Sequence, residues 1–407
     1  MKTHHTAPSR VGRLRLTGLY LLGLAAGLMI TPEAWAQPQS KPRSDFWFPS
    51  GGVYSILITN DTVYFGGDFK YVGPQTGRAA LFDVASGESS GTLPPVNGPV
   101  YGVESDGAGG WYIGGQFTKV GSVPATNLVH LLPDLSVDQK WDAGVRGTFV
   151  TALVKEEDRL YVGGSFSRIG GVQQANLGVV NAADGSLVSW NPEVSGAVYT
   201  VVVTNGLAYV GGAISSVGSS NRNSVAAIDL VTAKANGWNP NADAAVLALA
   251  VAGDVVYVGG QFTSIGGKPR NRLAALDTTT GQATTWNPNP NAMVRALAVT
   301  DSTVYVGGDF TTISVQNRAY LAAVNRSNGA GQALNLQLEG TTAGPVRSLR
   351  LIGNTLYIAG SFSKVQGSRH ALVTAVDLTT GEVVPNAPQG SEYYGGQWTA
   401  YVSEIAA

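Results

Sequence analysis

The chain has no cysteine, and only four histidines and three methionines among its 407 residues. The lack of cysteine excludes disulfide bonds, thiolate metal sites and cysteine nucleophiles together. Charged residues are also scarce, at 13%, and the formal net charge is −1. No basic block occurs after residue 36, so binding to the phosphate backbone is not expected. We therefore predict no nucleic-acid partner.

Long apolar runs are missing except near the N-terminus. An apolar stretch at 16–30 is followed by the small-x-small sequence of a cleavage site at 34–36, and it is preceded by the basic residues Lys2, Arg10, Arg13 and Arg15. Fifteen residues are short for a membrane span. We predict a signal peptide over 1–36, with an uncleaved anchor as the alternative. The mature chain would have no transmembrane segment and would be secreted, periplasmic or at the cell surface.

Glycine, in contrast, is abundant, with 53 residues. It recurs in an aromatic-x-small-Gly unit whose tyrosines are spaced by 48, 49, 48, 48, 48 and 52 residues: Tyr64, Tyr112, Tyr161, Tyr209, Tyr257, Tyr305 and Tyr357. A long and regular period of this kind indicates a repeat architecture.

Each unit contains four short β-rich segments separated by turn residues. Examples are "VRALAVTD" (294–301), "VYVGG" (304–308), "LAALD" (273–277) and "QATTWNP" (282–288). Four strands repeated seven times predict an all-β fold, a seven-bladed β-propeller of four-stranded antiparallel blades. An eight-bladed or incomplete ring is the next interpretation, and a β-solenoid is a further alternative.

The domain boundaries follow from the repeat. The propeller is predicted over 51–388. Residues 37–50 form a lead-in segment, and Trp47-Phe48-Pro49 within it resembles the fourth strands of later repeats, so it is a candidate for the strand that closes the ring. Residues 389–407 are a tail or the start of a further element. We expect a monomer.

The Gly-Gly pair after each tyrosine segment is interpreted as structural, supplying positive φ and removing Cβ at a tight bend. An aromatic soon after it is predicted to fill the space between blades: Phe69, Phe117, Phe166, Phe262, Phe310 and Phe362, with Ile214 in the fourth unit. Trp141, Trp190, Trp238 and Trp286 are predicted to pack against the neighbouring blade, and an exposed aromatic row that stacks sugars is the alternative.

These segments carry a family resemblance. "GGQFTSIGGKPRNRLAALDTTTGQATTWNPN" (259–289) resembles the delta-60 repeat of bacterial exported proteins, and its layout is similar to Kelch motifs. The resemblance extends over 47–388. It implies a propeller and no defined activity.

Residues with catalytic potential are few. The two histidines after the signal, His130 and His370, fall in different units and are predicted to be structural or at the surface. No nucleophile elbow, zinc-protease motif or phosphate-binding loop occurs. "GVESDGAGG" (102–110) lacks the ligand series of a calcium loop and is predicted to be a turn, as are "DTTTG", "DLTTG" and "NAADG" with their capping Asp or Asn.

Two repeated polar positions are candidates for ligand binding. The residue after Gly-Gly is Asp68, Gln116, Ser165, Ala213, Gln261, Asp309 and Ser361 in the seven units. Of these, Asp68, Gln116, Gln261 and Asp309 could hold a cation or a sugar hydroxyl at the channel mouth, or each could cap its own loop. The second set is Arg222, Arg270 and Arg318, which could clamp an anion or bond to backbone carbonyls.

The predicted function is an exported, non-catalytic scaffold that binds a protein or glycan and has no cofactor apart from a cation at the mouth. One alternative is a propeller enzyme with an axial site, quinoprotein-like or glycan-active. "LAALDTTTGQ" (273–282) is similar to a quinoprotein phrase. A copper-radical oxidase is excluded by the missing cysteine. Another alternative is a structural segment of a larger surface protein.

Overall fold

The computed structural model describes residues 47–49, 52–59, 62–68, 72–74, 93–339, 345–369 and 372–385. The predicted signal peptide, the 389–407 tail, Phe69 and His370 lie outside these ranges. Two compact units are present, one made of 1–75 with 393–398 and the other of 76–392 with 399–407. Every regular element in the described ranges is a β-strand. Nowhere in those ranges is there a helix with the length and apolarity needed to cross a membrane.

The first unit contains one repeat of the tyrosine segment. Strands β2 (Gly52–Thr59) and β3 (Thr62–Asp68) form an antiparallel hairpin, in which Leu57 lies opposite Tyr64. Strand β1 (Trp47–Pro49) pairs with β4 (Val72–Pro74), which follows the hairpin in the chain. The sequence at 47–49 is therefore a strand, paired within its own unit.

The second unit contains the other six repeats, each built on a three-stranded antiparallel sheet. The six sheets are, in chain order, β5 (Val100–Ser105), β6 (Trp111–Gly115) and β9 (Leu128–Leu131); β10 (Arg146–Glu156), β11 (Arg159–Ile169) and β13 (Leu177–Asn181); β15 (Val198–Thr204), β16 (Leu207–Gly212) and β19 (Val225–Asp229); β20 (Val246–Ala252), β21 (Val255–Gly260) and β24 (Leu273–Asp277); β25 (Val294–Val299), β26 (Thr303–Gly308) and β29 (Leu321–Asn325); and β31 (Val346–Ile352), β32 (Thr355–Gly360) and β35 (Val373–Asp377). The tyrosine lies in the central strand of each sheet.

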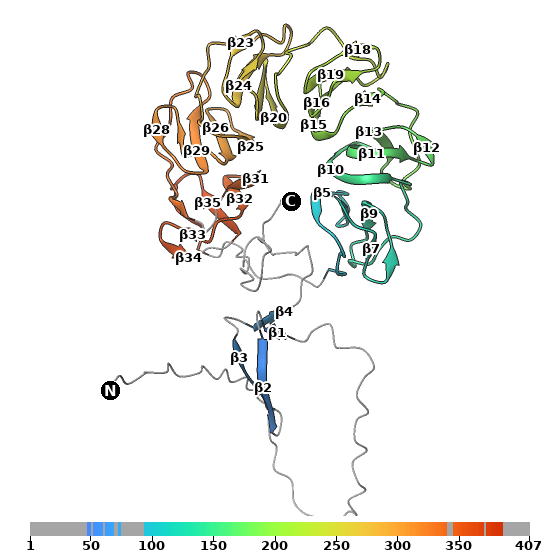
Figure 1. Ribbon diagram of the computed structural model, residues 1–407, viewed down its shortest axis with the longest axis vertical. Helices are drawn as coiled ribbons and strands as arrows, with labels where there is room; N and C mark the ends of the chain where they lie inside the picture. Colours follow the sequence, from blue (N-terminus) through green and yellow to red (C-terminus); the bar gives the residue numbers. More distant parts are fainter. Residues whose placement is uncertain are drawn as a thin grey trace, which may run out of the picture. The chain divides into compact units, whose positions relative to one another are not determined.

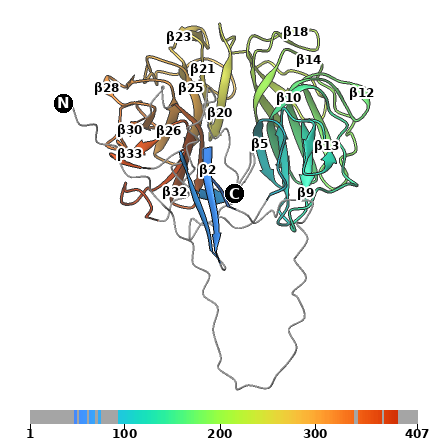
Figure 2. The same ribbon diagram turned by 60° about the horizontal axis from the view of Figure 1, so that its bottom comes forward.

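Consecutive sheets in this unit follow one another around an arc, with their first strands on its inner side (Figure 1). Neighbouring first strands pack together along the whole series from β5 through β10, β15, β20 and β25 to β31. The turned view shows β5, β10, β20 and β25 on the inner side of this arc (Figure 2). These are the radial sheets expected of a propeller.

The predicted long loop of each repeat holds a short hairpin. The strands of these hairpins are β7 (Lys119–Val120) and β8 (Val123–Pro124), β17 (Ser216–Val217) and β18 (Ser220–Asn221), β22 (Ser264–Ile265) and β23 (Lys268–Pro269), β27 (Thr312–Ile313) and β28 (Gln316–Asn317), and β33 (Lys364–Val365) and β34 (Ser368–Arg369), while β12 (Val172–Gln173) pairs with the end of β11. Two further strands, β14 (Val194–Ser195) and β30 (Leu338–Glu339), precede a first strand and pair with β17 and β33.

The predicted fourth strand is not formed as a strand. In each of the six repeats it is reduced to one bridge to the third strand, as between Leu276 and Ala283. Where a tryptophan follows this bridge, its indole reaches the next repeat; the Trp286 indole N–H, for example, donates to the Asn325 carbonyl at 2.9 Å. Each of these six repeats therefore forms three strands of the predicted blade and a single bridge at the place of the fourth.

The Gly-Gly pair was correctly interpreted as a place where Cβ has no room, but the predicted positive φ was wrong. Neither Gly259 nor Gly260 has positive φ, and the same holds for the pairs of the other described repeats. A Cβ on Gly259 would lie 2.5 Å from Cγ1 of Val294 in the next sheet. A Cβ on Gly260 would lie 2.3 Å from the Ala245 carbonyl oxygen. The pair is therefore part of its strand, and the missing Cβ atoms leave room for a side chain of the next sheet and for the backbone of the paired first strand.

The hydrophobic core lies between successive sheets. One cluster joins Tyr161 and Trp190 of the third repeat to Val198 and Val210 of the fourth, and others join later pairs. The residues predicted to fill these spaces are buried: Phe117, Phe166, Ile214, Phe262, Phe310 and Phe362. That prediction is confirmed for the described repeats. Each gap between sheets thus has its own sheet-on-sheet core.

Candidate ligand-binding face

A β-bulge occurs in each first strand directly opposite the Gly-Gly pair. In the fifth repeat Val246 pairs with Gly260 and Ala248 with Gly259, so Leu247 is the extra residue. The corresponding extra residues in the second, fourth, sixth and seventh repeats are Tyr101, Tyr199, Arg295 and Arg347. Bulges redirect side chains and are frequent at functional edges. The repeat therefore presents one variable side chain at the same place in each of these sheets.

The candidates after Gly-Gly lie beside these bulged residues. Asp309 accepts two hydrogen bonds from Arg295, at 2.7 Å from Nε and 2.8 Å from the terminal nitrogen. Gln116 accepts a 3.4 Å hydrogen bond from the Tyr101 hydroxyl. Gln261 instead reaches Met293 Sδ of the next repeat, at 3.9 Å. These three candidates thus contact neighbouring residues.

The fourth candidate of this set, Asp68, ends β3 opposite Gly52 in the first unit. For Asp68, the structure describes only the position of its backbone in the strand. A cation held at the channel mouth by Asp68 and Asp309 stays a prediction.

Apolar side chains cluster at the same end of the first strands. We call Tyr101, Phe149, Tyr199, Leu247 and Met293 the apolar rim. All five are half-buried. Tyr101 and Phe149 come from neighbouring sheets and meet edge to face, with ring centroids 6.1 Å apart. This contact joins the rim residues of the second and third repeats.

The periodic arginines bond to backbone carbonyls of their own repeats. Arg270, 9% exposed, donates to the Pro269 carbonyl at 2.8 Å and to the Thr284 carbonyl at 2.5 Å. Arg222 bonds in the same way to Asn221 and Asn236, and Arg318 to Asn317 and Gln332. Burial lowers the pKa of Arg270. These contacts hold the loop hairpin to the segment that follows the third strand, and anion binding by the arginines stays a prediction.

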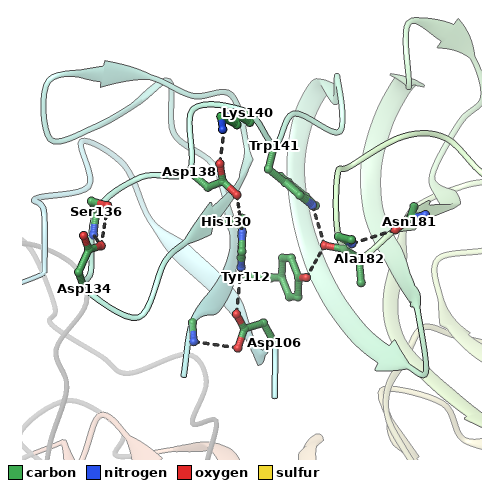
Figure 3. Close-up of polar contacts among 12 residues, drawn as sticks. Asp106, Tyr112, His130, Asp134, Ser136, Asp138, Lys140, Trp141, Asn181 and Ala182 are labelled. Atoms are coloured by element: carbon green, nitrogen blue, oxygen red, sulfur yellow. Dashed lines mark hydrogen bonds and ion pairs between the residues drawn. The ribbon is translucent and has the colours of Figure 1, made fainter. Parts of the chain in front are cut away.

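A buried polar cluster distinguishes the second repeat (Figure 3). His130 of β9 lies between two carboxylates, with Nδ1 3.1 Å from Asp138 Oδ2 and Nε2 3.2 Å from Asp106 Oδ2. The ring stacks on Tyr112, with centroids 4.7 Å apart. The tyrosine hydroxyl donates to the Ala182 carbonyl of the next repeat at 2.6 Å, and the Trp141 indole N–H donates to the same oxygen at 2.9 Å.

The electrostatics of this cluster follow from burial and hydrogen bonding. Burial raises the pKa of Asp106, but hydrogen bonds from the Ala108 and Gly110 N–H groups and from His130 bring it below its ordinary value. Burial raises the pKa of Tyr112 to about 12, helped by the charges of Asp106 and Asp138. Because the two carboxylates lie on opposite sides of one ring, they cannot converge on an ion. In the described ranges no group of three or more His, Asp or Glu is arranged to hold a metal ion.

Sequence reasoning placed His130 in a structural or surface role but missed its two aspartates. A signal was available in the repeat itself. On the third strand, the residue opposite the tyrosine is a histidine in the second repeat, whereas the other five sheets of the second unit have Val179, Ala227, Ala275, Ala323 and Ala375 there. The "GVESDGAGG" segment was predicted to be a turn; its first four residues belong to β5, and only 106–110 form the turn, in which Asp106 accepts from the Ala108 and Gly110 N–H groups.

The tryptophans and the capping aspartates behave as predicted. Trp190, Trp238 and Trp286 each donate from the indole to a backbone carbonyl at the end of the third strand in the following repeat. Asp277 caps the "DTTTG" turn by accepting from the Thr279 and Thr280 N–H groups. These residues therefore build the scaffold.

Comparison with known proteins places the chain in a family. Residues 96–386 match the family model described as outer membrane protein assembly factor BamB. This family includes interaction scaffolds and quinoprotein-like enzymes, and it is associated with the periplasm and the outer membrane. A search of the curated proteins finds no match to the chain. The resemblance to delta-60 and Kelch repeats stays a prediction.

The chain was also compared with solved structures. The computationally designed Ika8 protein is 14% identical, with a TM-score of 0.50 over 84% of this chain and 89% of that chain. The computationally designed Ika4 protein is 15% identical, with a TM-score of 0.32 over 46% of this chain and 98% of that chain. The likeness to Ika8 concerns the fold alone. The matched range contains all six repeats of the second unit, and the chain belongs to the family of the outer membrane protein assembly factor BamB.

Proposed function

We propose that this chain is an exported, non-catalytic seven-bladed β-propeller that binds a partner protein through the apolar rim. The observation that carries the proposal is the rim itself, in which Tyr101, Phe149, Tyr199, Leu247 and Met293 come from five consecutive repeats. Aromatic residues and methionine are enriched in protein interfaces relative to other surfaces. A rigid ring of sheets would hold these side chains in a fixed order.

The proposed blade number rests on the repeat. The hairpin β2–β3 has the same register shift as the first two strands of the other repeats, between Val53 and Ser55. We propose that it supplies the seventh blade. Curvature of the second unit supports a ring.

The proposed partner belongs to the assembly of outer membrane proteins. The support is the family, whose described member is an outer membrane protein assembly factor. The predicted signal peptide would deliver the chain to the same compartment. Many polar candidates have partners within the fold, as Arg270 and Asp309 do, which suits a scaffold. We propose that the chain works without a bound cofactor and as a monomer.

Site-directed photo-crosslinking in cells tests the proposal. A benzophenone amino acid at Tyr199 or Leu247 should crosslink to an envelope protein that mass spectrometry then identifies. The same probe at Thr279, exposed on the "DTTTG" turn, is the control and should give no such product. Crosslinks that are equal at both places, or absent from both rim positions, would contradict docking on the rim. Tyr199→Ala should weaken the purified complex by about tenfold or more, as expected for an interface aromatic.

The enzyme alternative, quinoprotein-like or glycan-active, requires titratable groups that converge on the axis. No such group in the described ranges supports it, and the second repeat's Asp106–His130–Asp138 cluster is enclosed within the fold. The alternative would gain support if the purified chain oxidised alcohols or sugars in the presence of a quinone cofactor and an artificial electron acceptor.

A further inference from the structure

A groove lies where the second and third repeats meet, at the Gly-Gly loop end of the sheets. Its volume is about 380 Å³, within the range of small-ligand sites. The side chains and backbone that line it are those of Asn97, Gln116, Phe117, Thr118, Thr126, Asn127, Gly147 and Thr148. None of these residues is charged. Three amides and three hydroxyls surround the space.

One wall of the groove is specific to this repeat. The first strands of the other sheets of this unit begin at the valine that precedes the bulge, as β15 does at Val198. The equivalent residue in the third repeat is Val150, yet β10 begins four residues earlier, at Arg146. The added segment pairs with β11 through Gly147 and Phe149. Gly147 permits the close approach, since a Cβ there would lie 2.2 Å from Phe166 Cα.

The side chain of Asn127 connects the two repeats that form the groove. Asn127 is 3% exposed, and its amide donates to the Gly147 carbonyl at 2.9 Å while its Oδ1 accepts from the Phe117 N–H at 3.2 Å. This residue therefore links the Gly-Gly loop of the second repeat to the added segment of β10. Preformed walls reduce the ordering cost of binding.

Other lining groups retain hydrogen-bonding capacity. Gln116 is exposed, and its contact with Tyr101 uses only the carbonyl oxygen, so both amide hydrogens are available. Thr118 Oγ1 accepts from Asn97 Nδ2 at 2.9 Å, which leaves its hydroxyl hydrogen to donate. Thr148 is exposed at the edge of the groove. Such neutral donors and acceptors match hydroxyl groups better than they match ions.

An aromatic pair stands next to these polar groups. Tyr101 bonds to Gln116, and Phe149 follows Thr148 in the chain; their rings meet at 85°. We propose that this groove binds a neutral oligosaccharide, with the amides and hydroxyls holding sugar hydroxyls and the aromatic pair contacting the apolar face of a ring. An extended peptide is less favoured, because the lining offers side-chain groups and not a free strand edge along its length. The aromatic pair also belongs to the apolar rim, whereas the residues that line the groove do not.

A glycan array of neutral oligosaccharides, probed with the whole chain from residue 37, tests the proposal. One arm presents free-reducing-end oligosaccharides, and a second presents the same sugars as glycolipids in neutral vesicles. Binding in either arm supports the site, and the arm identifies the source of the sugar. Hits are then measured by calorimetry.

Matched variants locate the binding. Thr148→Val keeps the shape and removes the hydroxyl, and Gln116→Ala removes the amide; each should weaken binding about tenfold, the effect of losing one hydrogen bond. Gln261→Ala changes the same position in the fifth repeat, away from the groove, and should leave affinity unchanged. Circular dichroism confirms that each variant is folded.

Three results would overturn the proposal. They are no neutral sugar binding at millimolar concentration by the folded protein, equal losses from Gln116→Ala and Gln261→Ala, and selective binding of an uncharged peptide library in place of sugars. Because the crosslinking test of the rim uses Tyr199 and Leu247, its failure would leave this result unaffected.

Discussion

Substituting the second glycine of a Gly-Gly pair is expected to be much more damaging than substituting the first. In Gly308→Ala the new Cβ would lie 2.2 Å from the Met293 carbonyl oxygen and 3.0 Å from Val294 Cα. Both are backbone atoms, one in the paired first strand and one directly before it, so the two strands must separate at the bulge. In Gly307→Ala the nearest atom is Cγ1 of Val346, at 2.5 Å, which belongs to a side chain of the next sheet.

The chain itself shows that the first position tolerates a methyl group, since the seventh repeat has Ala359 there, fully buried. Overpacking of a core costs roughly 1–3 kcal/mol, which we expect for Gly307→Ala. For Gly308→Ala we expect about 3 kcal/mol or more, because backbone pairing is lost as well. At about 2–4 °C per kcal/mol for a domain of this size, the melting temperature should fall by about 6–12 °C.

Urea unfolding followed by circular dichroism measures the difference, with calorimetry as a second method. Gly237→Ala is the control, because a Cβ there has no neighbour within 4 Å and φ is not positive. It should leave the free energy of unfolding unchanged or raise it slightly. If Gly308→Ala were as stable as Gly237→Ala, the explanation of the Gly-Gly pair as a site of close approach would be refuted.

Four further predictions follow from backbone strain, ionisation and hydrogen bonding. Val315 is fully exposed and has a φ of +61°, which is costly for a β-branched residue, so Val315→Gly should raise the free energy of unfolding by about 1 kcal/mol. Val231 is exposed without positive φ, so Val231→Gly should not raise it. Chemical denaturation measures both variants. The pKa of Asp106 is lowered in the folded protein, so the stabilisation by its carboxylate is present above about pH 4 and is lost as the pH falls through the folded pKa. Between pH 5 and 2, the free energy of unfolding of Asp106→Asn should therefore fall less than that of the wild type. The pKa of Tyr112 is raised to about 12, so its contribution is present below about pH 10 and lost as the pH rises through 12. Burial also raises the pKa of Tyr209, Tyr305 and Tyr357, so absorbance at 295 nm should show a group of late-titrating tyrosines that is smaller by one in Tyr112→Phe. Arg270→Lys should lower the melting temperature nearly as much as Arg270→Ala, because an ammonium cannot span two carbonyls, and equal stability of wild type and variants would contradict the clamp.

The tyrosine spacing was sufficient to predict the sheets, because each repeat buries the same face against its neighbour. The turn caps were also predictable, since Asp277 needs only residues two and three positions further on. The backbone conformation of Gly-Gly was not. A repeated glycine shows that a side chain is excluded at that position. Positive φ and a close neighbour both require glycine, so the sequence does not distinguish between them. The bulge that brings the neighbour close lies on the paired first strand.

Longer-range contacts were harder to foresee. Asp106 is 24 residues from His130 and Asp138 is 8 residues from it, and only the pairing of Tyr112 with His130 in the sheet brings the three together. The loop hairpins escaped prediction because arms of two residues are too short to show alternation. The extra segment of β10 was hidden for a related reason, since "RGTF" (146–149) reads as a turn when taken alone.

The indole bonds between repeats have a consequence for how the molecule comes apart. Trp190, Trp238 and Trp286 each sit in one repeat but bond to the next, so their surroundings report on a neighbour's integrity. Melting of a single blade should expose the tryptophan of the blade before it. Fluorescence from single-tryptophan variants would therefore show the direction in which unfolding spreads from one repeat of the second unit to the next, because each tryptophan responds before its own repeat unfolds.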